Sequence, residues 1–126
     1  MSGRIATETG SFDPVKLSEF LDMGGPELRD VLLAQVQMDL ARCRDVLTAA
    51  LASSEPSRDM NALRKTAHEV KGLSVTLGAD SLADTAEQAE QACTVHDRTA
   101  LAVLLPMLEA QTQQAGATLA ALAAGD

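Results

Sequence analysis

Aromatic residues are almost missing from this 126-residue sequence. They make up 2 % of it, as Phe12 and Phe20, and neither tryptophan nor tyrosine occurs. The hydrophobic interior must therefore be built from Leu, Val, Met and Ala, side chains that favour helices over sheets. Because the length suits one domain with one core, we expect a single all-α domain.

Positive charge is also scarce, since 10 Lys and Arg stand against 18 Asp and Glu, for a formal net charge of −8. An acidic chain is repelled by nucleic acids and by anionic membrane surfaces. No stretch approaches the roughly 20 apolar residues that span a bilayer. The start, MSGRIATETG, lacks the apolar run of a signal peptide. We therefore expect a cytoplasmic protein that binds neither nucleic acid nor membrane.

Cysteine is limited to Cys43 and Cys93, too few for a disulfide framework and without the clustered spacing of a zinc site. We interpret both as small core residues in a reducing cytoplasm. His96 follows Cys93 by three residues, but this pair lacks further ligands for a metal. We therefore expect no metal site, and we expect His96 to be a partly buried histidine at a helix end.

The N-terminal part divides into a tail and two helices. Residues 1–11 are small and polar and are expected to be a flexible tail, whereas residues 12–126 are expected to form the helical domain. Asp13 and Pro14 begin a short helix that ends before Gly24 and Gly25. A long helix opens at Pro26 and ends in a loop at residues 53–57. Its apolar residues recur at steps of four and three: Leu28, Leu32, Val36, Leu40, Cys43, Leu47 and Leu51.

The next helix is capped by Asp59 and closed by Gly78. Its predicted inward stripe is Leu63, Ala67, Val70, Ser74 and Leu77. A further helix starts at Asp80 or Ser81, and its stripe is Leu82, Ala86, Ala89, Cys93 and His96.

The last helix follows a turn at Asp97, and its predicted inward residues are Leu101, Leu104, Leu108, Ala115, Leu119 and Leu122. Pro106 lies inside this pattern, so either the helix kinks there or its regular part begins there. Four long amphipathic helices with short loops predict an up-down-up-down antiparallel four-helix bundle. The short N-terminal helix is expected to act as its lid.

His68 is the residue that does not fit a packing helix. On a helical wheel at about 100° per residue, with Leu63 at zero, the inward stripe lies within about 40° on either side. His68 then lies at about 140°, Lys71 at about 80° and Gly72 at about 180°. His68 is therefore predicted to point away from the core, with a cation beside it and a residue without a side chain one turn along.

This arrangement suits phosphoryl chemistry. A neutral imidazole is a good nucleophile towards phosphorus, and the Lys71 ammonium can stabilise the added negative charge. Gly72 would let a partner approach closely. The basic patch of Arg64, Lys65 and Lys71 would suit a partner with an acidic site. An exposed histidine is nevertheless most often a plain surface residue, and Glu69 can simply pair with Lys65 four residues away.

The run Ala67 to Ala79, AHEVKGLSVTLGA, followed by Leu82, resembles the signature of histidine-containing phosphotransfer (HPt) domains. The departures are Val70, where Leu is usual, and Leu73, where a small residue is common. Leu73 is predicted on the flank opposite His68, so it should not block access. The close match covers about 25 residues, and the predicted bundle agrees over the rest.

The resemblance implies that His68 accepts a phosphoryl group on Nε2 from an aspartyl phosphate of a receiver domain and passes it to another response regulator. It implies that Lys71 steadies phosphoryl oxygens and that Gly78 serves only the helix end. Gly72, and around it Arg64, Lys65 and Val75, would contact the receiver. By similarity to chemotaxis kinases, a carboxylate on the following helix would bond Nδ1. Counting without gaps gives Glu90, with Glu87 and Gln91 as alternatives.

The resemblance also implies a phosphocarrier and not an enzyme, because the sequence has neither a glycine-rich nucleotide loop nor an acidic metal cluster. No intrinsic cofactor is expected, and Mg²⁺ would belong to the receiver. The expected partners are response-regulator receiver domains and a sensor histidine kinase, of the hybrid kind for a relay, with this chain as a free-standing carrier.

Three alternatives stay open. One is a helical adaptor that docks receiver or kinase domains without being phosphorylated. Another is a fragment phosphorylated directly by a kinase catalytic domain. The third, an enzyme with His68 as general base, ranks last because no Asp, Ser or Cys stands at a suggestive position beside it.

Overall fold

The computed structural model describes residues 12–53 and 59–125, and within these ranges every element is a helix. The prediction of an all-α fold is therefore confirmed. The expected tail at 1–11 and most of the expected loop at 53–57 lie outside the described residues. The helices are α2 (Pro14–Asp22), α3 (Pro26–Ala52), α4 (Met60–Leu77), α5 (Asp80–Thr94) and α6 (Arg98–Ala123).

Short-range hydrogen bonds explain where these helices begin and end. The Asp13 carboxylate accepts from the Val15 amide at 2.9 Å, and Asp59 and Asp97 cap α4 and α6 in the same way, each at 3.0 Å. Gly78 ends α4 with a φ of 80°, in the left-handed region that favours glycine. The predicted caps at Asp13, Asp59 and Gly78 are confirmed, and the cap at Asp97 lies in the predicted turn.

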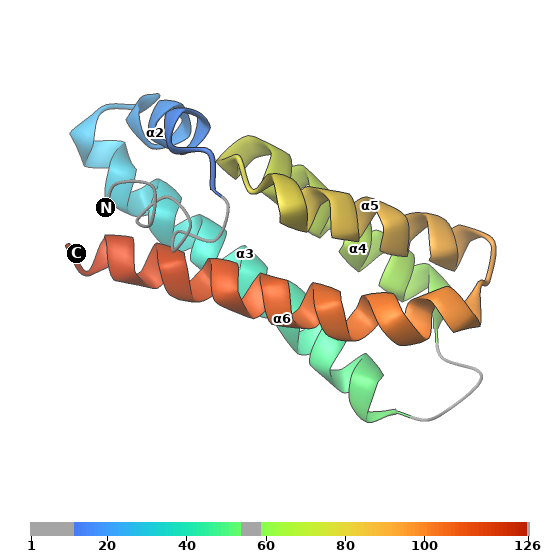
Figure 1. The fold of residues 1–126 in the computed structure, drawn as a ribbon. Coiled ribbons are helices and arrows are strands. Elements are labelled where there is room, and N and C mark those ends of the chain that lie inside the picture. Colours follow the sequence, from blue (N-terminus) through green and yellow to red (C-terminus); the bar gives the residue numbers. More distant parts are fainter. Residues whose placement is uncertain (1–11, 54–58, 126) are drawn as a thin grey trace, which may run out of the picture.

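The four long helices form a bundle in which each packs mainly against two others. The principal contacts join α3 to α4, α4 to α5, α5 to α6, and α6 back to α3. Consecutive helices run in opposite directions in Figure 1. Since the contacts close a ring, α4 and α6 lie diagonally opposite each other.

The short helix α2 packs against α3 and α4 at one end of the bundle (Figure 1). Its N-terminus is attached to the α4–α5 corner, because the Asp13 amide donates to the Gly78 carbonyl at 2.7 Å. Phe12 also forms an isolated bridge with Ala79, and its side chain is buried. A Cβ on Gly78 would lie 2.9 Å from that of Asp13, so glycine permits this close approach as well as the turn.

The core is built from leucine, valine and alanine, as the lack of aromatics requires. All five predicted inward residues of α4 are buried: Leu63, Ala67, Val70, Ser74 and Leu77. The Ser74 hydroxyl, inside the core, donates to the Val70 carbonyl at 2.6 Å and so leaves no unpaired donor.

Some predicted inward positions are wrong. Leu28 and Leu51 of α3 are exposed, and Leu33 and Ala50 are buried instead. Leu28 and Leu40 are separated by three steps of four residues. At about 100° per residue these steps rotate the side chain by about 120° around the helix axis, so Leu28 lies on the side of the helix and not on the buried face. Leu51 lies in the last turn of α3, at the rim of the bundle.

His96 is also not where the stripe placed it. Helix α5 ends at Thr94, and His96 is exposed in the following turn with a φ of 57°. The expectation of partial burial is wrong because the helical phase stops two residues earlier. In the last helix, α6 runs from Arg98 through Pro106, so its regular part does not begin at the proline. Of its six predicted inward residues four are buried, whereas Leu104 and Leu122 are only partly buried against the core. Leu105 and Thr112, which were not predicted, are buried as well.

Among the described helices, none combines the length and the hydrophobicity that crossing a bilayer requires.

Candidate functional site

His68 lies in the middle of α4 on its outward face. Its neighbours Ala67 and Val70 are buried, whereas 65 % of the His68 side chain is exposed. The ring therefore faces solvent, as the helical wheel predicts. Solvent exposure makes the imidazole accessible to a macromolecular partner.

A carboxylate from the next helix holds one edge of this ring. Nδ1 of His68 lies 2.9 Å from Oε2 of Glu90 on α5. A carboxylate accepts hydrogen bonds, so in the neutral ring the proton sits on Nδ1 and the Nε2 lone pair is free. Glu87 and Gln91, the two alternatives on α5, are exposed, and Glu90 is the one of the three that contacts the imidazole.

Glu90 also binds the lysine one turn along from His68. Its second oxygen, Oε1, lies 3.4 Å from Lys71 Nζ. Only 18 % of the Glu90 side chain is exposed, so this carboxylate is partly desolvated between an imidazole and an ammonium group. The Glu90 carboxylate thus orients both the His68 imidazole and the Lys71 ammonium group.

Gly72 leaves the surface beside His68 open. A Cβ built on Gly72 would meet nothing within 4 Å, so packing inside the chain does not require glycine there. Val75, one turn further along, is an exposed apolar residue. Lys65 is exposed, while the guanidinium of Arg64 donates to the Asn61 side chain at 3.0 Å.

The sequence of the chain matches the family model described as the Hpt domain over residues 27–124. The chain belongs to the Hpt domain family. Hpt domains are phosphocarrier modules that transfer phosphoryl groups through a histidine in two-component phosphorelays, with receiver domains and histidine kinases as partners. Neither the curated proteins nor the solved structures include a significant match. The matched range covers α3 to α6 and leaves α2 outside.

An ion-pair network on the other flank of the Hpt helix α4 was not predicted. The Arg42 guanidinium of α3 donates to both carboxylate oxygens of Glu69, with Nη1 at 3.0 Å from Oε1, and to Asp39 at 3.2 Å. Glu69 therefore pairs with a residue of another helix, in contrast to the alternative interpretation in which it simply pairs with Lys65. The sequence offers no signal for a pairing between positions so distant in the chain, because it depends on how α3 packs on α4.

The same network changes the titration of Glu69. The hydrogen bonds and the positive charge of Arg42 lower the pKa of the Glu69 carboxyl, against an opposing effect of partial burial. Because Glu69 directly follows His68 in the chain, the Arg42–Glu69 pair links α4 to α3 at the level of the histidine.

A hollow of about 380 Å³ lies between α2, α3 and α4 next to Gly72. Its lining is mainly apolar, with Phe20 from α2, Val36 from α3 and Leu73 from α4, and Asp39 and Glu69 stand among its polar residues. Leu73 packs partly buried against the core on this flank, away from the Glu90 flank that holds the His68 ring. It therefore leaves the imidazole accessible, as its position on the wheel predicts.

Within residues 12–53 and 59–125, no group of three or more His, Cys, Asp or Glu side chains is placed to hold a metal ion.

Proposed function

We propose that this Hpt domain is a carrier in a phosphorelay and that His68 is its phospho-accepting residue. Nε2 of His68 would attack the phosphorus of an aspartyl phosphate on a receiver domain. The bond from phosphorus to the aspartyl oxygen breaks, the receiver carboxylate leaves, and the group then passes to an aspartate of another response regulator. The single observation that carries this proposal is the exposed imidazole whose Nδ1 faces Glu90.

Glu90 and Lys71 have complementary roles in this proposal. Glu90 keeps the proton on Nδ1, so the nucleophilic lone pair stays on Nε2 during attack. Lys71 lies one turn from His68, and its ammonium would stabilise the phosphoryl oxygens after transfer. Phosphoryl transfer depends mainly on positioning and charge neutralisation, so these two groups meet the carrier's share of both needs.

The receiver would dock on the α4 surface around His68. Gly72 offers open space, Val75 offers an apolar contact, and Arg64 and Lys65 offer positive charge to the acidic pocket of a receiver. Mg²⁺ would come with the receiver, so the carrier needs no nucleotide site or cofactor of its own. We propose that residues 12–126 act as one domain in the cytoplasm, served by a sensor histidine kinase, of the hybrid kind for a relay.

The test is transfer from receiver domains phosphorylated on aspartate. Wild-type protein should acquire a label that is labile in acid and stable in base, as expected of phosphohistidine. The His68→Gln variant should acquire none. His96→Gln is the matched control, because His96 is also exposed but lies beyond the end of α5.

The alternatives give different outcomes in the same assay. Equal labelling of His68→Gln and wild type would exclude His68 as acceptor. Binding to receivers without labelling would indicate an adaptor. Labelling only by a kinase catalytic domain with ATP would indicate direct phosphorylation instead of a relay.

A further inference from the structure

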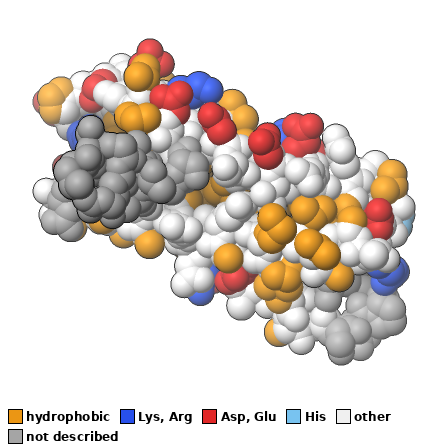
Figure 2. All heavy atoms as spheres, viewed as in Figure 1, with side chains coloured by type: hydrophobic (Ala, Val, Ile, Leu, Met, Phe, Trp, Pro, Cys, Tyr) orange, Lys and Arg blue, Asp and Glu red, His pale blue; other side chains and the backbone are white. Residues whose placement is uncertain are grey.

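The exposed side of α6 carries no charge along almost its whole length. Between Thr99 and Ala123, every exposed residue of α6 is alanine, valine, proline, methionine, threonine or glutamine. We call these residues the α6 face. Figure 2 shows hydrophobic side chains gathered over the N-terminal half of α6, and Val103 and Met107 are its large exposed apolar residues.

The one charged residue inside this stretch, Glu109, is turned to α3. Its Oε2 lies 3.5 Å from Arg44 Nε and 3.3 Å from the Thr48 hydroxyl, and 19 % of its side chain is exposed. It is therefore neutralised within the protein. The α6 face remains free of charge over about seven turns of helix, at about 3.6 residues per turn.

All of the net charge lies elsewhere in the chain. Helix α6 contains Arg98 and Glu109, which cancel, so the formal charge of −8 belongs entirely to the other residues. Two copies of the chain therefore repel each other through most of their surfaces. The α6 face is where two copies can meet while burying apolar area and no charge.

We propose that the α6 face is the contact of a homodimer of this chain. A basic or acidic partner would find no opposite charge there, whereas a second copy presents the same neutral, apolar helix. Such a contact between identical surfaces closes around a two-fold axis and stops at two copies.

The size of the face indicates a weak dimer. A helix of 26 residues is about 39 Å long, and a strip about 10 Å wide gives roughly 400 Å² for each copy. A stable interface buries about 800 Å² on each partner. We therefore expect dimers at high micromolar concentration.

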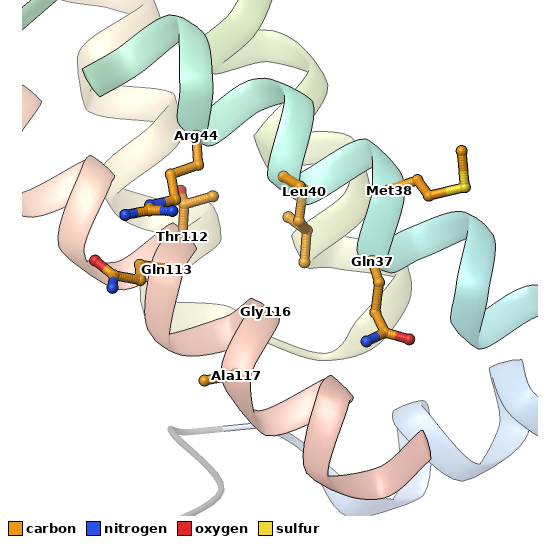
Figure 3. A pocket seen from close by; sticks show the side chains of 9 residues that line it. Gln37, Met38, Leu40, Arg44, Thr112, Gln113, Gly116 and Ala117 are labelled. Carbon is orange, nitrogen blue, oxygen red and sulfur yellow. The ribbon is translucent and has the colours of Figure 1, made fainter. Parts of the chain in front are cut away.

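A hollow beside the α6 face can add to this area. It has a volume of about 410 Å³ and lies between α3 and α6, with Met38 and Gln37 on one side and Gly116 and Ala117 on the other (Figure 3). Arg44 also lines it, and its charge is neutralised by the ion pair with Glu109. Gly116 has nothing within 4 Å of where a Cβ would stand, so space for a side chain of the second copy exists there. Met38 is itself exposed and would become covered.

The proposed dimer is independent of the proposed phosphotransfer. Because α4 and α6 lie diagonally opposite in the bundle, a contact through α6 leaves both copies of His68 exposed. Loss of the dimer should therefore leave phosphotransfer to each copy unchanged.

The test is sedimentation equilibrium of the full chain between about 20 µM and about 1 mM, a range that brackets weak interfaces. The average mass should rise from 13.2 kDa towards twice that value. Higher salt should favour the dimer, because it screens the repulsion between two acidic copies. Val103→Glu and Met107→Glu should each raise the dissociation constant by about tenfold or more.

Val15→Glu is the matched control. It makes the same exchange at a site of equal exposure, 64 % for Val15 against 62 % for Val103, but on α2 at the end of the bundle. It should retain the dimer, and circular dichroism should show that all variants keep wild-type helix content.

Four results would overturn the proposal. They are a constant mass of 13.2 kDa at every concentration, an unchanged dimer in Val103→Glu and Met107→Glu, equal weakening by Val15→Glu, or a dimer that dissociates as salt rises. Binding of a different protein to the α6 face of a strictly monomeric wild type would also overturn it.

Discussion

Nδ1 of His68 lies 2.9 Å from Oε2 of Glu90, across the contact between α4 and α5. The two residues are 22 positions apart, and only the packing of the two helices brings them together. In the neutral ring this contact keeps the proton on Nδ1, so in the proposed phosphotransfer Nε2 is the nucleophile. It also gives the first prediction.

Replacing Glu90 with alanine should remove the preference of the neutral His68 ring for a proton on Nδ1. Nitrogen NMR of Glu90→Ala should show the proton shared between Nδ1 and Nε2, because no carboxylate selects Nδ1. Phosphotransfer from a receiver should slow by about 10- to 100-fold, the usual effect of losing an orienting partner. Glu87→Ala, an exposed carboxylate on the same helix, should change neither measurement. An unchanged tautomer in Glu90→Ala would remove Glu90 from the orienting role.

Substitutions at Gly72 should separate stability from transfer. Since a Cβ there meets nothing, Gly72→Ala should raise the free energy of unfolding by about 1 kcal/mol through helix propensity. Gly72→Leu should fold but transfer phosphoryl groups slowly, because its side chain occupies the open space next to His68. Urea unfolding and transfer kinetics measure the two effects.

Gly116 offers the control for that experiment. It is also a glycine inside a helix with open space at the Cβ position, but it lies on α6. Gly116→Ala should bring a similar gain in stability and leave transfer unchanged. Full transfer by Gly72→Leu would contradict the docking role of Gly72.

The Arg42–Glu69 pair should make stability depend on pH. Arg42 lowers the pKa of Glu69 in the folded protein, so the carboxylate stabilises the fold at neutral pH, and this contribution is lost as the pH falls through the lowered value. Arg42→Met should therefore lower the urea midpoint at neutral pH and have a much smaller effect at a pH below that value.

The matched background for this test is Glu69→Gln, which keeps the shape of the side chain but not its charge. In Glu69→Gln, the Arg42→Met substitution should lose most of its pH dependence, with a remainder from Asp39. An equal loss of stability at neutral and acidic pH would show that the pair acts through packing alone.

The cysteines should react only when the protein unfolds. Burial in the core raises the pKa of Cys43 to about 12, and burial also raises the pKa of Cys93. In mildly alkaline buffer both thiols of the native protein should therefore react slowly with an aromatic disulfide reagent. Where the reagent reaches a thiol only in the unfolded chain, the labelling rate equals the rate of unfolding. Addition of urea should make both thiols react quickly. Rapid labelling of either cysteine in the native protein would contradict its burial.

The sequence predicts α4 best, because a regular stripe on a helix of this length keeps one phase. The same stripe places His68 outward, and a count along the family pattern reaches Glu90. Predictions fail where the phase drifts or stops, as at Leu28 in the long helix α3 and at His96 beyond the end of α5. Whether Glu90 or Glu87 contacts His68 depends on the rotation of α5 about its own axis relative to α4, and a local sequence pattern does not determine this rotation.

Contacts between helices distant in the chain are the least predictable part. The pairing of Arg42 with Glu69 looks, from the sequence, like two ordinary surface charges. The buried side of helix α6 is also hard to predict from the sequence, because apolar residues lie on almost every side of this helix. For that reason the pattern does not identify Leu105 and Thr112 as buried residues.

The diagonal placement of α4 and α6 has a consequence for how this protein can change in evolution. The solvent-exposed surfaces of α4 and α6 lie on opposite sides of the bundle, with the core between them. Mutations that alter the choice of receiver on one side need not disturb self-association on the other. Selection can therefore act on the two surfaces separately, and a duplicated gene could acquire new signalling partners without losing its way of assembling.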